Sequence, residues 1–496
     1  MRTAYTSDQI RAAEAALMAT LPEGALMQRA AAGLAVVCAR MLGGVYGSRV
    51  ALLVGGGDNG GDALYAGARL AARGARVEAI AAGARVHTAG LEALRRAGGR
   101  IVDPEGAAAR AVLAAADLIV DGMVGIGGSG ALREPYATLA RLAGEAPGEV
   151  VAVDVPSGVD ASSGQVEGAA VPADATVTFG AWKTGLLVDP GRGHAGRAEL
   201  VDIGLGPHLP DPDATAPEDA DVAALLPRPG ATSDKYRRGV VGIAAGSESY
   251  TGAAVLAVGG ALRGGTGMVR YAGTAEPVAQ VRARWPEAVI TTLAPGEGVE
   301  RVGRVQAWVL GPGLGTGDEA HAVARSVLAS DVPVLVDADA LTLLAADRSL
   351  LYRSAPVLIT PHAGELSRLL DVPRDRIEAC RLENVRRAAM ELGVTVLLKG
   401  STTLVAQEGR PVGVNPTGSP WLATGGTGDV LAGLAGALLA AGLDAYDAAS
   451  AAAYLHGIAG REGPLPAADV AQALPGAARG LVNGPGRVVP PARLRR

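Results

Sequence analysis

Short apolar runs alternate with helical stretches through the first part of the chain. The runs consist mainly of Val, Leu, Ile and Ala, and segments between them, such as 62–72 and 136–142, are predicted to be helices. Alternating strands and helices are typical of a parallel sheet with helices on both faces. The runs contain few polar positions, as expected when both faces of the sheet are buried. The predicted strands are residues 50–54, 77–80, 118–120, 150–153 and 175–179.

The same pattern resumes after a segment of different composition. Residues 207–222 are rich in Pro and acidic side chains and show no periodicity, so we expect an interdomain linker there. The fold class is therefore α/β with two domains, 1–206 and 223–475, followed by a Gly-, Pro- and Arg-rich tail over 476–496. The apolar stretch 430–441 predicts a buried Ala/Leu helix. The strands predicted for the second domain are 240–244, 307–310, 334–336, 357–359 and 394–398.

Composition and charge narrow the classes of function. The formal net charge of −5 argues against a protein that binds nucleic acid or an anionic membrane. The two cysteines, Cys38 and Cys380, predict buried thiols and no disulfide framework, which suits a reducing cytosol. No apolar run approaches the roughly 18 residues of a membrane span, and the N-terminus lacks a signal-peptide pattern. We therefore expect a cytoplasmic protein, and the apolar faces of α/β domains predict a homo-oligomer.

Polar, glycine-rich loops follow three strands of the first domain. In open α/β sheets, ligands bind at this carboxyl edge of the strands. The loop 55–62 combines glycines, which let a backbone approach a phosphate, with the side-chain oxygens of Asp58 and Asn59. The loops 121–130 and 153–160 add further Asp, Ser and Gly residues. The three loops are expected to converge on one crevice whose oxygen donors suit a hard cation.

The first loop also permits a different interpretation. Gly55, Gly57 and Gly60 satisfy the spacing Gly-x-Gly-x-x-Gly of dinucleotide-binding folds. The acidic residue that would bind the ribose is then Glu78, which falls inside the next strand instead of at its end. A nicotinamide-dependent dehydrogenase is therefore a poorly supported alternative, and it leaves the second domain unexplained.

These loops and the stretch 178–187 resemble the NAD(P)H-hydrate epimerase family over nearly all of residues 1–205. The resemblance implies a Rossmann-like three-layer sandwich, a bound K⁺ and, as substrates, the hydrated cofactors NADHX and NADPHX. It makes Asp154 the acid–base group and leaves Lys183 as either a positive charge at the site or a surface lysine. The implied potassium ligands are Asn59, Asp121 and Ser157. The residues implied to line the hydrate site are Asp58, Asn59, Gly60, Gly61, Asp62, Gly125, Ile126, Gly127, Gly128, Ser129, Gly130, Ala131, Tyr136 and Asp154.

The chemistry of a hydrated nicotinamide agrees with a carboxylate at this site. The hydroxyl sits on a carbon next to the ring nitrogen, whose lone pair can expel it or open the ring. The stereocentre is therefore labile, and a carboxylate that donates and retrieves a proton suffices to speed its inversion.

The strongest signal in the second domain is the segment 415–431, which contains Gly425-Gly426-Thr427-Gly428-Asp429. A run of backbone amides that ends at a helix N-terminus forms an anion hole for a phosphoryl group. Asp429 can take a proton from a hydroxyl that attacks phosphorus. The alternative role of Asp429 is a helix N-cap, which does not require the preceding glycines. No Gly-x-x-x-x-Gly-Lys-Ser/Thr loop occurs, so this is not a P-loop enzyme.

This segment resembles the ribokinase-like superfamily, and other stretches resemble its ADP-dependent NAD(P)H-hydrate dehydratase branch over about 225–475. The resemblance implies a ribokinase-like α/β domain, ADP as co-substrate and Mg²⁺ with the nucleotide. The residues implied to hold the nucleotide are Lys399, Gly400, Ser401, Thr402, Thr403 and Gly428. Those implied to face the hydrate are Ala253, Gly315, His362 and Asp429.

Both halves would then act on one damaged cofactor. Transfer of the β-phosphoryl group of ADP to the ring hydroxyl turns a poor leaving group into phosphate, whose departure restores the double bond. Two further alternatives stay open: a vitamin-precursor kinase fused to a Rossmann-like binding domain, and a first half that only binds the cofactor and regulates the second. Loss of epimerase activity on Asp154→Ala would exclude the regulatory alternative.

Overall fold

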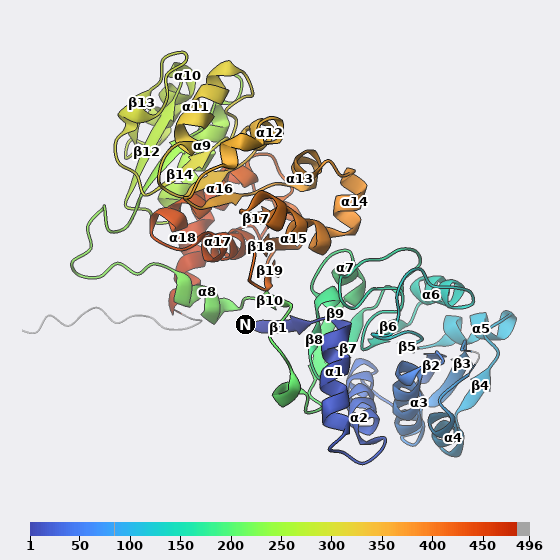
Figure 1. Cartoon of the computed structure of the whole chain (residues 1–496). Helices are drawn as coiled ribbons and strands as arrows, with labels where there is room; N and C mark the ends of the chain where they lie inside the picture. The colour runs from blue at the N-terminus through green and yellow to red at the C-terminus, as the bar shows by residue number, and fades with distance from the viewer. Residues whose placement is uncertain (84, 484–496) are drawn as a thin grey trace, which may run out of the picture. The chain divides into compact units, whose positions relative to one another are not determined.

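The computed structural model describes residues 1–83 and 85–483, which form two compact units (Figure 1). The boundary between the units lies between Ala214 and Thr215, inside the segment predicted as a linker. That segment is more ordered than its composition predicts, since it contains strand β10 (Ala214–Ala216) and the start of helix α8 (Asp219–Leu225). A capping box between Glu218 and Asp221 explains the start of α8.

The first unit is built on a seven-stranded parallel sheet in the order β4-β3-β2-β5-β6-β7-β9. All five predicted strands are confirmed, each to within two residues at either end. The strands are β2 (Arg49–Val54), β3 (Arg76–Ala81), β4 (Arg100–Val102), β5 (Leu118–Gly122), β6 (Glu149–Val153), β7 (Ala175–Phe179) and β9 (Arg197–Val201). Two shorter strands, β1 (Arg2–Tyr5) and β8 (Trp182–Lys183), pair with each other in parallel.

Helices cover both faces of this sheet, as predicted. Leu52 of β2 packs in a core with α1 to α4, whereas Leu53 packs in a second core with α5 and α6. Successive side chains of a strand point to opposite faces, so one apolar run supplies both cores. The helices are α1 (Ser7–Met18), α2 (Ala25–Met41), α3 (Asp58–Ala71), α4 (Thr88–Arg96), α5 (Ala107–Ala115), α6 (Tyr136–Glu145) and α7 (Gly191–Ala195).

Helix α3 starts four residues earlier than the predicted 62–72 and therefore includes Gly60 and Gly61. A Cβ at Gly60 would lie 2.4 Å from the carbonyl oxygen of Gly55, whereas a Cβ at Gly61 would lie 2.9 Å from Cε of the flexible Met27 side chain. Gly60, which suggested a loop, is thus required by a close backbone contact in the first turn of the helix.

The strand order places a ligand crevice between β2 and β5. From β2 the chain moves through α3 to β3 on one side, and β5 then continues the sheet on the other side. Such a reversal leaves an opening at the carboxyl ends of the two strands. The start of α3 and the residues after β5 lie at this opening.

The second unit contains a largely parallel sheet in the order β13-β12-β11-β14-β15-β16-β17-β18-β19, in which β18 and β19 are antiparallel to their neighbours. All five predicted strands of this domain are confirmed, the last one residue shorter than predicted. The strands are β11 (Val240–Ala244), β12 (Met268–Gly273), β13 (Val289–Thr292), β14 (Ala307–Leu310), β15 (Val334–Val336), β16 (Val357–Ile359), β17 (Thr395–Leu398), β18 (Thr403–Ala406) and β19 (Val412–Asn415).

Two helices of this unit, α9 and α16, pack unusually closely. A Cβ at Gly433 would lie 1.9 Å from the carbonyl oxygen of Ala257, and one at Gly260 would lie 2.2 Å from that of Val430. A Cβ at Gly426 would lie 2.4 Å from Cδ1 of Leu256, and one at Gly264 would lie 2.8 Å from Cδ1 of Leu434, so the two helices run in the same direction and their N-termini lie at the same edge of the unit. The helices are α9 (Thr251–Arg263), α10 (Ala275–Arg284), α11 (Asp318–Leu328), α12 (Asp339–Ala346), α13 (Ala363–Leu370), α14 (Arg374–Ala379), α15 (Arg381–Leu392), α16 (Thr427–Ala440), α17 (Ala445–Ala459) and α18 (Ala467–Asn483).

Residues 476–483 of the predicted tail form the last turns of helix α18. This helix buries Val470, Ala471, Leu474 and Ala477 in the core of the second unit. Their helical spacing was hidden by the Gly and Pro content of the segment. The rest of the predicted tail, 484–496, lies outside the described residues.

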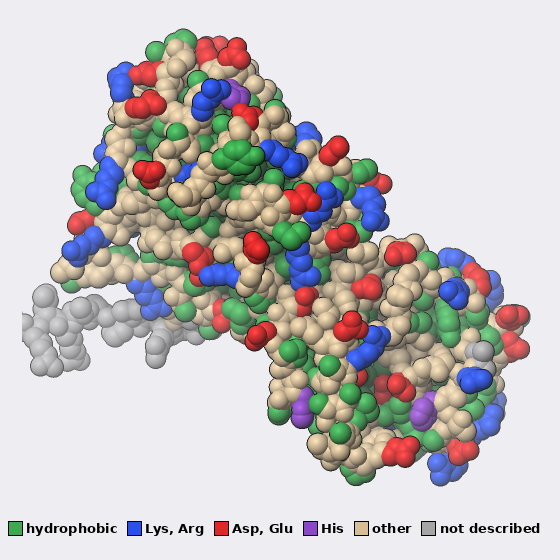
Figure 2. Space-filling model, in the orientation of Figure 1, with side chains coloured by type: hydrophobic (Ala, Val, Ile, Leu, Met, Phe, Trp, Pro, Cys, Tyr) green, Lys and Arg blue, Asp and Glu red, His purple; other side chains and the backbone are tan. Residues whose placement is uncertain are grey.

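The cysteines, the distribution of charge and the apolar character of the helices can each be examined in the structure. Cys38 and Cys380 are both buried and are not joined in a disulfide, as predicted. On the face in Figure 2, acidic and basic side chains are interspersed over both units. Within the described part of the chain, no helix combines the length and the apolar character needed to cross a membrane.

Candidate active sites

Asp154, directly after β6, is held in an uncommon backbone conformation. Its φ angle is 67°, and its N–H donates a hydrogen bond to the carbonyl oxygen of Val177 at 2.7 Å. Left-handed backbone at a non-glycine residue is uncommon and is found disproportionately at functional sites. The side-chain Oδ1 accepts hydrogen bonds from Thr178 Oγ1 at 3.2 Å and from the N–H of Phe179 at 3.0 Å. The end of β7 therefore fixes the orientation of this carboxylate.

Lys183, on β8, is bound to the same carboxylate oxygen. Its Nζ donates to Asp154 Oδ1 at 2.5 Å and to the carbonyl oxygen of Phe179 at 2.8 Å, and its side chain is only 1% exposed. An ammonium group is buried at this depth only when it is paired. The alternative of a surface lysine is therefore wrong. Among the described residues, the hydrogen bonds to the Asp154 carboxylate from Thr178, Phe179 and Lys183 all reach Oδ1, which leaves Oδ2 as the atom for a ligand.

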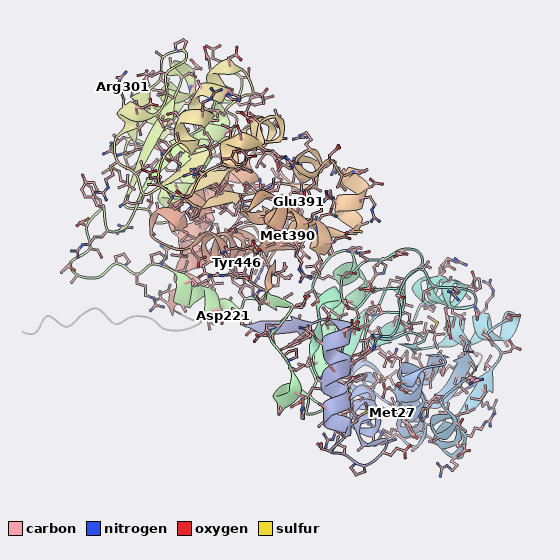
Figure 3. The ribbon with its side chains drawn as sticks, viewed as in Figure 1. Met27, Asp221, Arg301, Met390, Glu391 and Tyr446 are labelled. Carbon is pink, nitrogen blue, oxygen red and sulfur yellow. The ribbon has the colours of Figure 1, made fainter. Side chains whose placement is uncertain are left out.

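A cavity of about 1280 Å³ opens beside Asp154. Helix α3 contributes Asp58, Asn59 and Asp62 to its wall, and the loop after β5 contributes residues 125–128. Met27 of α2, labelled in Figure 3, lines the cavity next to α3. The structure thus brings together residues that sequence reasoning placed on three separate loops.

Sequence reasoning missed the contribution of α1 to this cavity. Arg11 and Glu14 line it, although no motif pointed to them. The helix buries Ile10, Ala13 and Leu17 in the core, so the neighbouring face of the helix is turned to the cavity. Only the packing of α1 on the sheet could have shown this.

The cavity contains a concentration of carboxyl groups. Asp62 is 8% exposed, and its Oδ1 has no hydrogen-bond partner among the described residues. Burial, followed by the charges of Asp154 and Asp58, raises the pKa of Asp62 well above its usual range. Burial and Asp154 also raise the pKa of Glu14 to about 7, against the opposing effect of Lys183. Protons are therefore retained in this cavity near neutral pH.

The three implied potassium ligands lie at the same opening of the sheet. Ser157 donates its Oγ to Asp121 Oδ1 at 2.6 Å and its N–H to Oδ2 at 2.8 Å. Asp121 is completely buried, and this burial raises its pKa to about 6. A Cβ at Gly125 would lie 2.9 Å from Oδ1 of Asn59, so the two residues are in close contact. The buried Nδ2 of Asn59 has no hydrogen-bond partner among the described residues. These carboxylate, hydroxyl and amide oxygens fit a hard monovalent cation, whose charge would offset that of buried Asp121.

The remaining residues of the predicted hydrate site do not all reach the large cavity. Residues 129–131 and Tyr136 line a second hollow of about 300 Å³, which shares Gly127 and Gly128 with the first. Gly60 and Gly61 are buried in α3 and are not among the residues that line either hollow.

In the second unit, Lys399 follows β17 and is held by an aspartate. Its Nζ donates to Asp337 Oδ1 at 2.5 Å, and Asp337, at the end of β15, is 1% exposed. A Cβ at Gly428 would lie 3.3 Å from this Nζ. The ammonium group therefore faces the glycine-rich loop, where it can meet an anionic ligand.

Asp429 lies in the first turn of α16, near this lysine. The N-cap of α16 is Gly426, so the alternative role of Asp429 as the N-cap is wrong. Burial, followed by the charge of Asp337, raises the pKa of Asp429 to about 7, although Lys399 opposes the shift. A carboxylate with this pKa is a competent base near neutral pH.

A buried histidine, which sequence reasoning missed, anchors the glycine-rich loop. His456 of α17 lies with its Nε2 2.9 Å from the carbonyl oxygen of Thr427, and burial lowers the pKa of His456 to about 4. The neutral ring donates Nε2–H to this carbonyl, since a carbonyl can only accept. Thr427 Oγ1 in turn donates to the carbonyl oxygens of Leu422 at 2.7 Å and Thr424 at 2.9 Å.

The residues predicted to face the hydrate come from several elements. A Cβ at Gly313 would lie 2.7 Å from Cβ of Ala253, so the loop after β14 packs on the first turn of α9. The N–H of Gly315 donates to Asp339 Oδ2 at 2.8 Å. The common edge of α9 and α16 places Ala253 and Asp429 at the same end of the unit.

His362 has a structural role that the sequence left open. It is the N-cap of α13, and its Nδ1 accepts hydrogen bonds from the N–H groups of Gly364 at 2.9 Å and Glu365 at 3.2 Å. The Glu365 carboxylate accepts from the N–H of His362 at 2.8 Å and completes a capping box. The histidine side chain is 55% exposed. Its contact with a hydrate stays a prediction.

The predicted nucleotide residues 399–403 form the turn between β17 and β18. Gly400 and Ser401 are exposed, whereas Thr402 and Thr403 are buried. A Cβ at Gly418 would lie 2.1 Å from the carbonyl oxygen of Ser401, so this turn packs on the segment that leads to the glycine-rich loop. The described residues include no group of three or more His, Cys, Asp or Glu side chains placed to hold a metal ion, so we assign no protein ligand to Mg²⁺.

Comparisons with known proteins cover almost the whole chain. A family model described as YjeF-related protein N-terminus matches residues 23–185, and one described as NAD(P)H-hydrate dehydratase matches residues 241–473. The bifunctional NAD(P)H-hydrate repair enzyme Nnr of Mycobacterium leprae is 50% identical over 478 residues, which cover 95% of each chain. That of Moorella thermoacetica is 36% identical and covers 85% of this chain and 84% of its own.

The chain belongs to the family of bifunctional NAD(P)H-hydrate repair enzymes.

As a member of the Nnr family, the chain is a two-domain enzyme of nicotinamide-cofactor repair, with an isomerase half and a lyase half. The dehydrogenase and vitamin-kinase alternatives are therefore wrong. A solved structure of the ADP/ATP-dependent NAD(P)H-hydrate dehydratase from Bacillus subtilis, co-crystallised with ATP and Mg²⁺, is 31% identical to this chain. It matches with a TM-score of 0.49 and covers 53% of this chain and 97% of its own.

Proposed function

We propose that the first domain interconverts the R and S hydrates of NADH and NADPH, and that the second converts the S hydrate to NAD(P)H with ADP, giving AMP and phosphate. The observation that carries the proposal is the presence of two carboxylate sites, each beside a lysine, in the two halves of one repair-family chain. Asp154 with Lys183 forms one site, and Asp429 with Lys399 forms the other.

In the epimerase site, the residues bind the substrate and move protons. The cavity beside Asp154 accepts the hydrated ring, and Oδ2 of Asp154 is the atom that reaches the substrate hydroxyl. Expulsion of the hydroxyl by the ring nitrogen leaves a cationic ring. The carboxylates of Asp58 and Asp154 favour that cation electrostatically.

In the dehydratase site, the residues combine an anion hole with a base. Asp429 takes the proton of the ring hydroxyl as its oxygen attacks the β-phosphorus of ADP, and AMP leaves. Lys399 and the amides of the glycine-rich loop stabilise the phosphoryl charge. The ring nitrogen then expels phosphate, and loss of a proton from the neighbouring carbon restores the double bond.

Ions, location and assembly extend this proposal. Asn59, Asp121 and Ser157 would hold K⁺, whose positive charge supports the loop around the hydrate. Mg²⁺ would arrive with the nucleotide phosphates, to which it binds with few protein ligands. A cytoplasmic location and a homo-oligomeric state stay predictions from the sequence.

The test follows the absorbance of the reduced nicotinamide after mixing purified protein with both NADH hydrate epimers, with and without ADP. Complete recovery that requires ADP would support both activities. Recovery of one epimer's share would remove the epimerase claim, and no recovery with ADP or ATP would remove the whole proposal. Full recovery by an Asp154→Ala variant would instead support a first domain that only binds and regulates.

A further inference from the structure

The epimerase cavity contains an acidic side chain to which the proposed reaction assigns no role. Glu14 lies on α1 and reaches the cavity from the helix layer, whereas Asp154 reaches it from the carboxyl end of β6. The core contacts of Ile10, Ala13 and Leu17 fix the rotation of α1 about its axis. The position of Glu14 is therefore set by the fold and not by a mobile loop.

Charged groups on its own helix and on three other segments surround Glu14. Those that face it are Arg11 on its own helix, Asp58 and Asp62 on α3, Asp154 after β6 and Lys183 on β8. Both cations are engaged elsewhere. Lys183 is bound to Asp154, and Arg11 donates to Asp8 Oδ1 at 3.0 Å and to the carbonyl oxygen of Ile126 at 2.9 Å. Burial and the charge of Asp154 raise the pKa of Glu14 to about 7, so its proton is held near neutral pH.

Epimerisation through loss and return of water needs one protonated and one deprotonated group in the site at the same time. In the first step the C–O bond breaks, an acid gives its proton to the departing oxygen, and water leaves a cationic ring. In the second step water attacks the other face, a new C–O bond forms, and a base takes the surplus proton. One proton thus passes from the acid to the base, and the two groups have exchanged states when the epimer leaves. A pair of carboxyls in different environments supplies both states.

We propose that Glu14 is the second acid–base residue of the epimerase, acting across the cavity from Asp154. The proposal rests on the proposed epimerase function. Lys183 and the end of β7 stabilise Asp154 as the carboxylate, and Glu14 supplies the proton. In the reverse direction the same two groups exchange roles.

The test uses the full chain and measures the relaxation of a single purified NADH hydrate epimer towards the epimer mixture, without ADP. Glu14→Gln is expected to lower kcat for this relaxation by about a hundredfold or more, which is the usual contribution of a general acid. KM should change little. Glu14→Asp should recover part of the rate, because it keeps the carboxyl group. Glu92→Gln, the same change on exposed α4, should leave the rate unchanged.

The pH profile separates a catalytic role from a structural one. For the unmodified chain, the rate in the direction that uses protonated Glu14 should fall as the pH rises above about 7. Glu14→Gln should lose this alkaline limb. An unchanged rate, or a lowered rate that keeps the limb, would overturn the proposal. If the unmodified chain does not interconvert the epimers, the proposed epimerase function itself fails. ADP-dependent dehydration of the S epimer by each variant checks that the chain is folded.

Discussion

The two sites use the same pair of residue types in opposite ways. In the first domain, Lys183 is bound to Asp154, the aspartate that would act on the substrate. In the second, Lys399 is bound to Asp337, and the proposed base, Asp429, is not part of this ion pair. The first arrangement places the lysine on the candidate acid–base carboxylate itself. In the second arrangement the lysine faces the glycine-rich loop, and the pKa of Asp429 is raised to about 7. The two sites thus differ in whether the lysine pairs with the proposed acid–base aspartate or with a second aspartate.

The largest effect is expected for Asp429→Asn in the second domain. Loss of the base should lower the ADP-dependent dehydration of the S hydrate by about a thousandfold. Epimer interconversion should not change, because the first domain has its own site. The measurement is NADH formation from the S hydrate with ADP. A retained rate would show that Asp429 does not take the hydroxyl proton.

The next largest effect is expected when the buried ion pair between Lys183 and Asp154 is broken. Lys183→Met leaves Asp154 buried without its cation and should lower the unfolding free energy by about 3 kcal/mol. Epimer interconversion should fall, and chemical denaturation measures the stability. Lys235→Met, the same change at an exposed lysine, is the control. Equal stability of the two variants would contradict the burial of the pair.

The pH dependence of dehydration gives a smaller and more specific effect. Asp429 must be ionised to act as a base, so kcat should rise with pH and level off above about 7. Below this value the rate should fall about tenfold for each pH unit. A profile that is flat from pH 5 to 8 would contradict the raised pKa of Asp429. Stopped assays at each pH avoid the acid lability of the product.

The smallest effect is expected at His362. His362→Ala removes the N-cap of α13 and should lower the unfolding free energy by about 1 kcal/mol. His362→Asn keeps a capping side chain and should recover most of this loss. If His362 also binds the hydrate, both variants should raise KM for the S hydrate. A change in stability alone would leave His362 as a cap only.

Much of the fold could be predicted from the sequence, because buried parallel strands leave a local signal. The apolar runs at 50–54 and 240–244 are strands in the structure, and the Ala/Leu run after Asp429 is the buried helix α16. The linker and tail were less predictable. The Pro and Gly residues of these segments obscure the sequence signals of the capping box of α8 and of the buried face of α18.

Some residues of the candidate sites could likewise be predicted from the sequence, and others could not. Asp154 directly follows a strand, and Asp429 follows a glycine-rich loop at the start of α16, so each belongs to a contiguous motif that the sequence alone determined as a candidate site. Glu14 and His456 belong to no motif and reach the sites only through helix packing. The pairing of Lys183 with Asp154 and of Lys399 with Asp337 also joins residues far apart in the chain. Tertiary structure alone decided these partners, because burial and the distances between charged groups exist only after the chain has folded.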